Sequence, residues 1–238
     1  MLHEQNCFIS LTFDDKWLPD SFSVEKREWQ LFAKRLRKKL GSKKIRFLSS
    51  GEYGDESYRP HYHALIFGHD WPDKKIWKRN KDGSYLYTSE QLSSVWPYGL
   101  ATSGAVTYKS AAYVARYVLK KMGGELAADH YLRVHPLTGK LVQVQPEFAT
   151  HSNKPGLGSG WFDKFKSDAF PSDFIMVDDK KHSVPRYYTQ KLKEHEAKQI
   201  KRRRMAKAVK KKADQTPARL KVREEVFAGR IKLLKRSL

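Results

Sequence analysis

Hydrophobic and polar residues alternate in several short stretches of the first 110 positions. Cys7–Phe13 alternates and is rich in residues that favour strands, so it predicts a β-strand. Lys44–Ser50 and His61–Gly68 predict two further strands, and Leu100–Tyr108 predicts a fourth. The connection between the second and the third is short. It indicates an antiparallel hairpin, because a parallel pair would need a long crossover.

Three other segments carry apolar residues at helical spacing. Ser23–Leu40 is the longest, with Ser23 at its expected start and Gly41 as its stop signal. Thr88–Trp96 predicts a short helix opened by a capping box between its first residue and Gln91. Ser110–Met122 predicts a third helix, which two following glycines end.

The order of these elements, β α β β α β α, predicts an α+β fold in which helices cover one face of a sheet. We place a first domain at residues 1–170. A basic C-terminal extension, partly helical, follows at residues 171–238.

The charge of the chain is strongly positive and unevenly distributed. The chain has 47 Lys and Arg residues against 26 Asp and Glu, a formal net charge of +21, and so large a charge favours a nucleic-acid partner. The segment from Lys191 to Leu238 holds 18 of the cations and five of the acids. Its apolar stripe is thin. It fits a solvated or partly disordered extension, and equally an arm that follows DNA phosphates.

Composition excludes several other classes of protein. Hydrophobic residues make up 39% and aromatic residues 13% of the chain, which is enough for a packed core. No segment approaches the ~18 consecutive apolar residues of a membrane span. The single cysteine, Cys7, excludes an internal disulfide. We therefore expect a soluble protein that does not bind membranes.

The first chemical motif is the pair His61 and His63. Residues two apart on a strand point to the same face, so the two imidazoles form a candidate chelating pair. Such a pair alone is more often structural. Glu52 lies in the preceding predicted strand, however, and hairpin pairing would bring it beside the histidines. One carboxylate and two imidazoles suit Mg²⁺ or Mn²⁺ bound to a phosphate better than a closed zinc site. The alternative for Glu52 is an exposed carboxylate on an edge strand.

The second motif is a tyrosine pair on the third predicted helix. Tyr113 and Tyr117 are four residues apart and share one helical face, and Lys120 lies along the same side. Two phenols beside a lysine suit phosphoryl transfer through a covalent intermediate, with Lys120 stabilising charge at the tyrosine oxygen. The alternative is an aromatic stripe that belongs to the core.

Candidate DNA contacts surround these two motifs. Arg59 precedes the histidine strand, whereas Arg116 and Lys121 follow the tyrosines, and all three are placed to contact phosphates. The tryptophans at positions 71, 77 and 96 are candidates for stacking on unpaired bases, although Trp96 also fits a core position.

Together these motifs resemble the HUH endonucleases that initiate rolling-circle replication. The resemblance rests on the strand Phe8–Phe13, the His-hydrophobic-His strand and the Tyr-x-x-x-Tyr-x-x-Lys helix, in that order. It extends to the replication initiators of microviruses of the gokushovirus kind through Gly51-Glu52-Tyr53-Gly54, Arg59–Phe67, Ala111–Lys121, Lys154-Pro155-Gly156, Trp161-Phe162 and Pro185-Arg186-Tyr187-Tyr188. It covers roughly residues 5–190.

The resemblance implies a fold and a mechanism. The fold is a central antiparallel sheet of about five strands flanked by helices, with His61 and His63 in the middle. Glu52, His61 and His63 hold Mg²⁺ or Mn²⁺ while one tyrosine attacks single-stranded DNA at the replication origin. This leaves a 5′-phosphotyrosine and a free 3′-hydroxyl, and the second tyrosine rejoins the ends. The implied partners are single-stranded origin DNA, the double-stranded replicative form and the polymerase and helicase of a bacterial host, in whose cytoplasm the protein acts.

Two other functional classes remain open at this point. One is a basic nucleic-acid-binding module without catalysis, which the composition alone supports. The other is an HUH-type transposase. Transposases of this kind usually have one tyrosine, so the pair Tyr113 and Tyr117 discriminates against them.

Overall fold

The computed structural model describes residues 2–80, 83–116, 121–125 and 127–233. Within this part the chain forms two compact units that divide between Leu157 and Gly158, and each unit is described by itself. α5 (Ser159–Ala169) belongs to the second unit, so the division precedes this helix, whereas the predicted boundary at residue 170 follows it. The physical reason is packing, because Phe162 of α5 lies in one hydrophobic cluster with Ile200.

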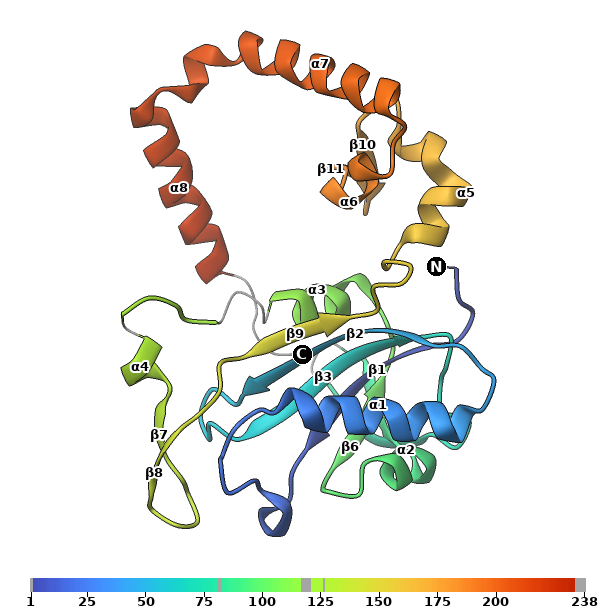
Figure 1. Cartoon of the computed structure of the whole chain (residues 1–238), viewed down its shortest axis with the longest axis vertical. Coiled ribbons are helices and arrows are strands. Elements are labelled where there is room, and N and C mark those ends of the chain that lie inside the picture. Colours follow the sequence, from blue (N-terminus) through green and yellow to red (C-terminus); the bar gives the residue numbers. More distant parts are fainter. Residues whose placement is uncertain (1, 81–82, 117–120, 126, 234–238) are drawn as a thin grey trace. The chain divides into compact units, whose positions relative to one another are not determined.

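The first unit is built on a sheet in which the described residues form seven strands and every neighbouring pair is antiparallel (Figure 1). The strand order is β4-β5-β6-β1-β3-β2-β9. The strands are β1 (Asn6–Thr12), β2 (Arg46–Tyr53), β3 (Pro60–Phe67), β4 (Lys75–Arg79), β5 (Tyr85–Thr88), β6 (Ala101–Gly104) and β9 (Phe148–His151). The predicted α+β class and central antiparallel sheet are confirmed, with seven strands in place of about five.

β4, β5 and β9 are the strands that sequence analysis misses. Every residue of β4 is exposed, so no alternation of buried and exposed positions marks it. β9 has four residues and pairs with β2 at the other edge of the sheet, which is too short for a periodic pattern. β2 differs from its prediction in another respect. It continues beyond Ser50 to Tyr53, so it includes Glu52.

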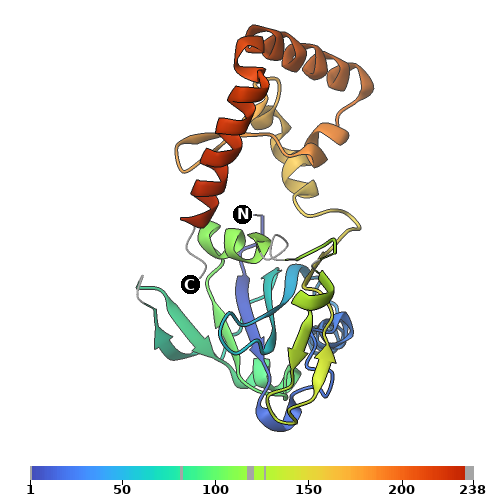
Figure 2. The same cartoon turned by 90° about the vertical axis from the view of Figure 1, so that its left-hand side faces the viewer.

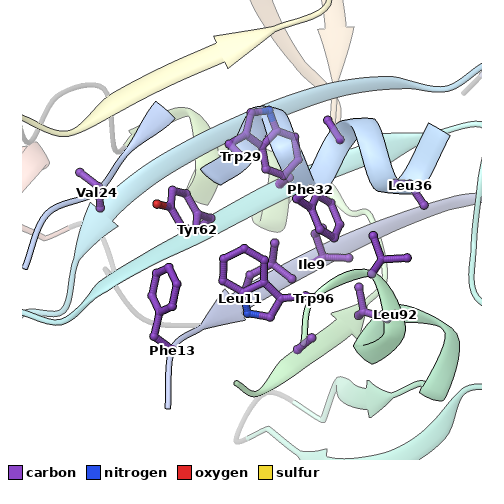
Figure 3. Close-up of a cluster of buried hydrophobic side chains, with 14 of the residues drawn as sticks. Ile9, Leu11, Phe13, Val24, Trp29, Phe32, Leu36, Tyr62, Leu92 and Trp96 are labelled. Carbon is purple, nitrogen blue, oxygen red and sulfur yellow. The ribbon is translucent and has the colours of Figure 1, made fainter. Parts of the chain in front are cut away.

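One face of the sheet carries the main hydrophobic core, beneath α1 (Lys26–Leu40) and α2 (Glu90–Val95). Figure 3 shows the buried side chains that meet there: Trp29, Phe32 and Leu36 of α1, Leu92 of α2, the neighbouring Trp96, and Ile9, Leu11 and Tyr62 of the central strands. Burial of each large apolar side chain contributes roughly 1.5–3 kcal/mol. This packing fixes which face of β1 and β3 turns inward, and so directs the alternate residues of these strands to the opposite face.

The helix ends follow the predictions in part. α1 ends before Gly41, which has a φ of +60° as expected of a helix stop. It does not begin at Ser23, because that buried hydroxyl accepts a 2.7 Å hydrogen bond from the backbone N–H of Gln145 instead. Ser89, and not Thr88, caps α2, since its hydroxyl accepts a 3.0 Å hydrogen bond from the helix backbone.

The opposite face of the sheet is covered by α3 (Tyr108–Arg116). Val114 of this helix is fully buried in a small cluster with Phe8 of β1 and Leu65 of β3. The prediction that helices lie on one face is therefore wrong. The second face of the sheet is also apolar at its centre, and the third helix provides the stripe that covers it.

The remaining elements of the first unit are η1 (Asp15–Trp17), α4 (Ala127–His130) and the hairpin of β7 (Leu132–Val134) and β8 (Leu141–Gln143). Figure 2 shows this unit from a second direction. Among the described residues, no helix combines the length and the apolar character needed to cross a membrane.

The second unit is mostly helical. After α5 it contains the hairpin of β10 (Phe174–Val177) and β11 (Lys180–Ser183), then α6 (Arg186–Gln190), α7 (Glu194–Lys210), η3 (Lys212–Gln215) and α8 (Pro217–Lys232). Its core gathers Phe162, Phe170, Leu192 and Ile200, with other apolar residues around them. Ile200 is the one buried residue of α7, and α8 buries none. The predicted helices with thin apolar stripes are confirmed for this part of the chain.

Candidate active site

The register of the β2–β3 hairpin assembles a group of three candidate metal ligands. Glu52 pairs directly with His61, and Ser50 pairs with His63, so the three side chains of Glu52, His61 and His63 leave the sheet on one face. One ligand atom from each lies within 4.8 Å of the others. The hairpin prediction brings together the residues it should. The alternative of an exposed Glu52 is wrong, because its side chain is 1% exposed.

Both imidazoles turn Nε2 toward the carboxylate. Oε1 of Glu52 lies 3.0 Å from Nε2 of His63 and 3.6 Å from Nε2 of His61. Nδ1 of His61 lies 3.0 Å from the carbonyl oxygen of Arg59. Only a ring N–H donates to a carbonyl, so this contact places a proton on Nδ1 and leaves the Nε2 lone pair of the neutral ring facing Glu52.

This donor set fits a divalent cation. One carboxylate oxygen and two imidazole nitrogens converge from one side, so the other side of a bound ion stays open for water or a phosphate oxygen. Burial of Glu52 supports this assignment, because a buried carboxylate is costly unless a cation or hydrogen-bond donors compensate its charge.

Helix α3 places Tyr113 against this group. The Tyr113 hydroxyl lies 3.4 Å from Nε2 of His63, and its ring meets the His63 ring edge-on with 5.2 Å between centroids. Val114, the next residue, anchors the helix on Phe8 and Leu65. The start of α3 is fixed as well, because the buried Ser110 hydroxyl accepts a 2.8 Å hydrogen bond from the backbone N–H of Thr107.

The structure treats the other predicted site residues differently. Tyr117 and Lys120 lie outside the described residues. Arg116 is half-buried at the last position of α3, and Lys121 is exposed. Arg59 ties the segment after β1 to the start of β3. Its guanidinium lies 2.6 Å from the Asp15 carboxylate and donates a 2.8 Å hydrogen bond to the carbonyl of Phe13.

The three tryptophans proposed for base stacking also separate. Trp71 and Trp96 are fully buried in the main core, so their proposed role is wrong. The indole N–H of Trp96 donates a 2.8 Å hydrogen bond to the carbonyl of Thr12, as suits a structural residue. Trp77 remains exposed on β4.

Sequence reasoning misses two residues that shape the site. Phe8 is buried and stacks on His63, with 5.4 Å between centroids and 21° between the rings, and it also meets Tyr113 edge-on. The direct pairing of Phe8 with Leu65 places them in register. Gly51, beside Glu52, leaves room for Phe148 of β9, because a Cβ at position 51 would lie 2.6 Å from that ring. The alternation of β1 contained the signal for Phe8, whereas nothing in the sequence marked β9.

The fold and site define a class: an α+β protein whose central sheet carries a Glu-His-His candidate metal group with a tyrosine held against it. A family model for replication-associated proteins of the ORF2 type matches residues 6–122, the stretch from β1 past α3 that holds this group. The chain belongs to this family.

Three phage proteins are similar to it. "Replication-associated protein VP4" of Bdellovibrio phage phiMH2K is 34% identical over 193 residues, which cover 78% of this chain and 57% of that protein. "Replication-associated protein ORF2" of Spiroplasma virus 4 is 30% identical over 200 residues, with coverage of 79% and 58%. "Replication-associated protein ORF4" of Chlamydia phage 1 is 35% identical over 126 residues, with coverage of 50% and 31%. The chain thus spans less than two thirds of the length of each relative. No solved structure matches it significantly.

Proposed function

We propose that the chain is a metal-dependent endonuclease that nicks single-stranded DNA at a phage replication origin by tyrosine attack. The observation that carries this proposal is the position of the Tyr113 hydroxyl, 3.4 Å from His63 within the Glu52, His61 and His63 group. A strand-transfer reaction needs a nucleophile and a charge-stabilising centre within reach of one phosphate, and this arrangement supplies both.

The residues of the site divide the work. Glu52, His61 and His63 hold Mg²⁺ or Mn²⁺, and the bound ion withdraws charge from a non-bridging phosphate oxygen. The Tyr113 oxygen forms a bond to phosphorus while the bond from phosphorus to the 3′ oxygen breaks. The 3′ oxygen takes up a proton in place of the one that the phenol gives up. A phenol, with a pKa near ~10, is a weak nucleophile unless it is placed and stabilised in this way.

The products are a 5′-phosphotyrosine on the chain and a free 3′-hydroxyl on the DNA, which a host polymerase extends. The phosphodiester is exchanged for a phosphotyrosine ester, so rejoining needs no ATP. Tyr117, four residues after Tyr113, is the proposed second nucleophile that cuts the regenerated origin. Lys120 is proposed to stabilise charge at the tyrosine oxygen, and Arg59, Arg116 and Lys121 to contact phosphates.

The proposed partners follow from this reaction. They are single-stranded origin DNA, the double-stranded replicative form in which the origin resides, and a helicase and polymerase of the bacterial host. The proposed place of action is the cytoplasm of that host. Membership of a replication-associated family and a net charge of +21 support a DNA partner.

The test is a denaturing gel of the chain incubated with Mn²⁺ and single-stranded oligonucleotides that tile the origin region of its own genome. We expect a protein-linked DNA band that maps by mass spectrometry to Tyr113 or Tyr117. The double variant Tyr113→Phe/Tyr117→Phe should lose this band and still bind DNA. Tyr108→Phe is the matched control, because this tyrosine opens the same helix and is 58% exposed.

Each other outcome contradicts the proposal in a defined way. Cleavage without an adduct would indicate metal-dependent hydrolysis. Binding of every oligonucleotide without cleavage would favour the non-catalytic basic module. An adduct that joins two DNA ends without nicking an origin would favour the transposase.

A further inference from the structure

The hairpin formed by β4 and β5 is a surface that the proposed reaction leaves unused. It lies at the edge of the seven-stranded sheet, where β4 is the terminal strand. Figure 2 shows it in teal, running out from that edge. All five residues of β4, Lys-Ile-Trp-Lys-Arg, are exposed, so this strand contributes no side chain to a core.

Aromatic and cationic side chains are interleaved on this hairpin. Trp77 is 48% exposed and Tyr85 is 40% exposed. The guanidinium of Arg79 lies 5.8 Å from the centre of the Tyr85 ring, on the paired residue of the opposite strand. Lys75, Lys78 and Arg79 give β4 three positive charges and no negative one, although Lys75 forms an exposed ion pair with Glu90 at 2.8 Å.

A bulge gives Trp77 a special position. Ile76 pairs with Tyr87 and Lys78 pairs with Leu86, so Trp77 is the extra residue that the bulge inserts. Bulges interrupt a ladder and redirect a side chain, and they occur often next to binding sites.

Protection of the sheet edge explains only part of this composition. Natural edge strands carry lysines and bulges that block pairing with another chain, and Lys75 and Lys78 serve that purpose. An exposed tryptophan and an exposed isoleucine on the same strand work against it, because they make the edge more adhesive. The aromatic side chains therefore need another explanation.

We propose that the β4–β5 hairpin binds unpaired DNA, with Trp77 stacking on a base and Lys78 and Arg79 contacting adjacent phosphates. Exposed aromatic rings among cations are the features that bind single strands without reading their sequence. This inference deepens the proposed function, because it adds a second contact for the strand that the site cuts. The hairpin holds DNA outside the Glu52, His61 and His63 group.

Anisotropy of a fluorescent single-stranded 20-mer, titrated with the full chain in EDTA, measures this binding without cleavage. Trp77→Ala should weaken binding about 5- to 100-fold, the range that loss of one base-stacking contact implies. Trp77→Phe keeps a ring and should retain most of the affinity. Ile76→Ala is the matched control, since this neighbour is exposed and apolar but has no ring.

Two further readouts separate stacking from other contacts. Tryptophan fluorescence should be quenched when DNA binds to the wild-type chain, and Trp77→Phe should lose much of this quenching while it still binds. Trp77→Ala should have a smaller effect on a blunt duplex of the same sequence, because paired bases already stack on one another. Lys78→Gln should lower the salt slope for single strands by about 0.7.

Unchanged affinity of Trp77→Ala for the 20-mer would overturn the inference, and so would an equal loss in Ile76→Ala. An equal loss on duplex and single strand would also overturn it, as would a change of oligomeric state in Trp77→Ala without a change in DNA affinity. These outcomes are independent of nicking. Failure of the adduct test would leave them unaffected, and an adduct with unchanged binding by Trp77→Ala would refute the hairpin inference alone.

Discussion

Replacement of Phe8 by leucine tests whether the sheet itself positions the candidate nucleophile. Phe8 is buried at the centre of the face that α3 covers, with its ring 5.4 Å from that of His63 and 6.3 Å from that of Tyr113. Leucine keeps an apolar side chain of similar bulk but loses both ring contacts. Each aromatic contact is worth about 0.5–1.5 kcal/mol, so the variant should lose roughly 1–3 kcal/mol of unfolding free energy.

The effect on the reaction should be larger than this stability loss suggests. Below its unfolding transition the variant stays folded, but His63 and Tyr113 lose the surface that fixes their mutual position. A displacement of about 1 Å between reacting groups costs up to about 100-fold in rate. We expect the initial rate of adduct formation to fall by about tenfold or more.

Phe32→Leu is the matched control. Phe32 is fully buried on the other face of the sheet and also has two ring contacts, at 5.3 Å with Trp29 and 6.3 Å with Trp96. Its loss should lower the free energy of unfolding in urea by a similar amount and leave adduct formation nearly unchanged. Equal rates for the two variants would refute the reasoning, because Phe8 would then act through global stability alone.

Three other results follow from the structure. Glu52→Gln should weaken Mn²⁺ binding in calorimetric titration by more than the roughly 10–100-fold cost of losing a supporting partner; unaltered affinity would place the metal elsewhere. Four exposed cations of α7, namely Lys201, Arg202, Lys207 and Lys210, should each contribute about 0.9 to the salt slope for duplex DNA, so changing all four to glutamine should lower the slope by about 3–4; an unchanged slope would refute the arm. Burial raises the pKa of the Cys7 thiol to about 12, so the native thiol should resist disulfide reagents at pH 8.5 and react once the chain unfolds. Since unfolding then releases a proton, this group should also lower stability as the pH rises above ~9; rapid labelling of the folded chain would contradict the assignment.

The parts of the fold that the sequence predicts are those with a long periodic pattern. β1, β3 and the end of α1 follow their predictions because each has a strong apolar face or a glycine stop. The position of Glu52 beside His61 also follows, since it needs only a short antiparallel hairpin. These inferences rest on local chemistry, which a single sequence contains.

The parts that escape prediction depend on distant residues. β9 is four residues long and joins the sheet only because Gly51 leaves space for Phe148. Phe8 is easy to place on a strand, but its stacking on His63 requires the register of β1 with β3 and the docking of α3. Ser23 favours a helix start locally, yet the backbone of Gln145, more than 100 residues later, takes its hydroxyl.

The pairing of Glu52 with His61 limits which insertions and deletions the chain can survive. Alternate residues of β2 face opposite sides, with Gly51 packed against Phe148 and Glu52 beside the histidines. Loss of one residue within β2 before Glu52 would exchange these sides, leaving a carboxylate in the core and an empty position at the site. The connection at positions 54–59 has no such restriction. Length variation among functional descendants of this sequence should therefore collect in that turn and be absent from the two strands it joins.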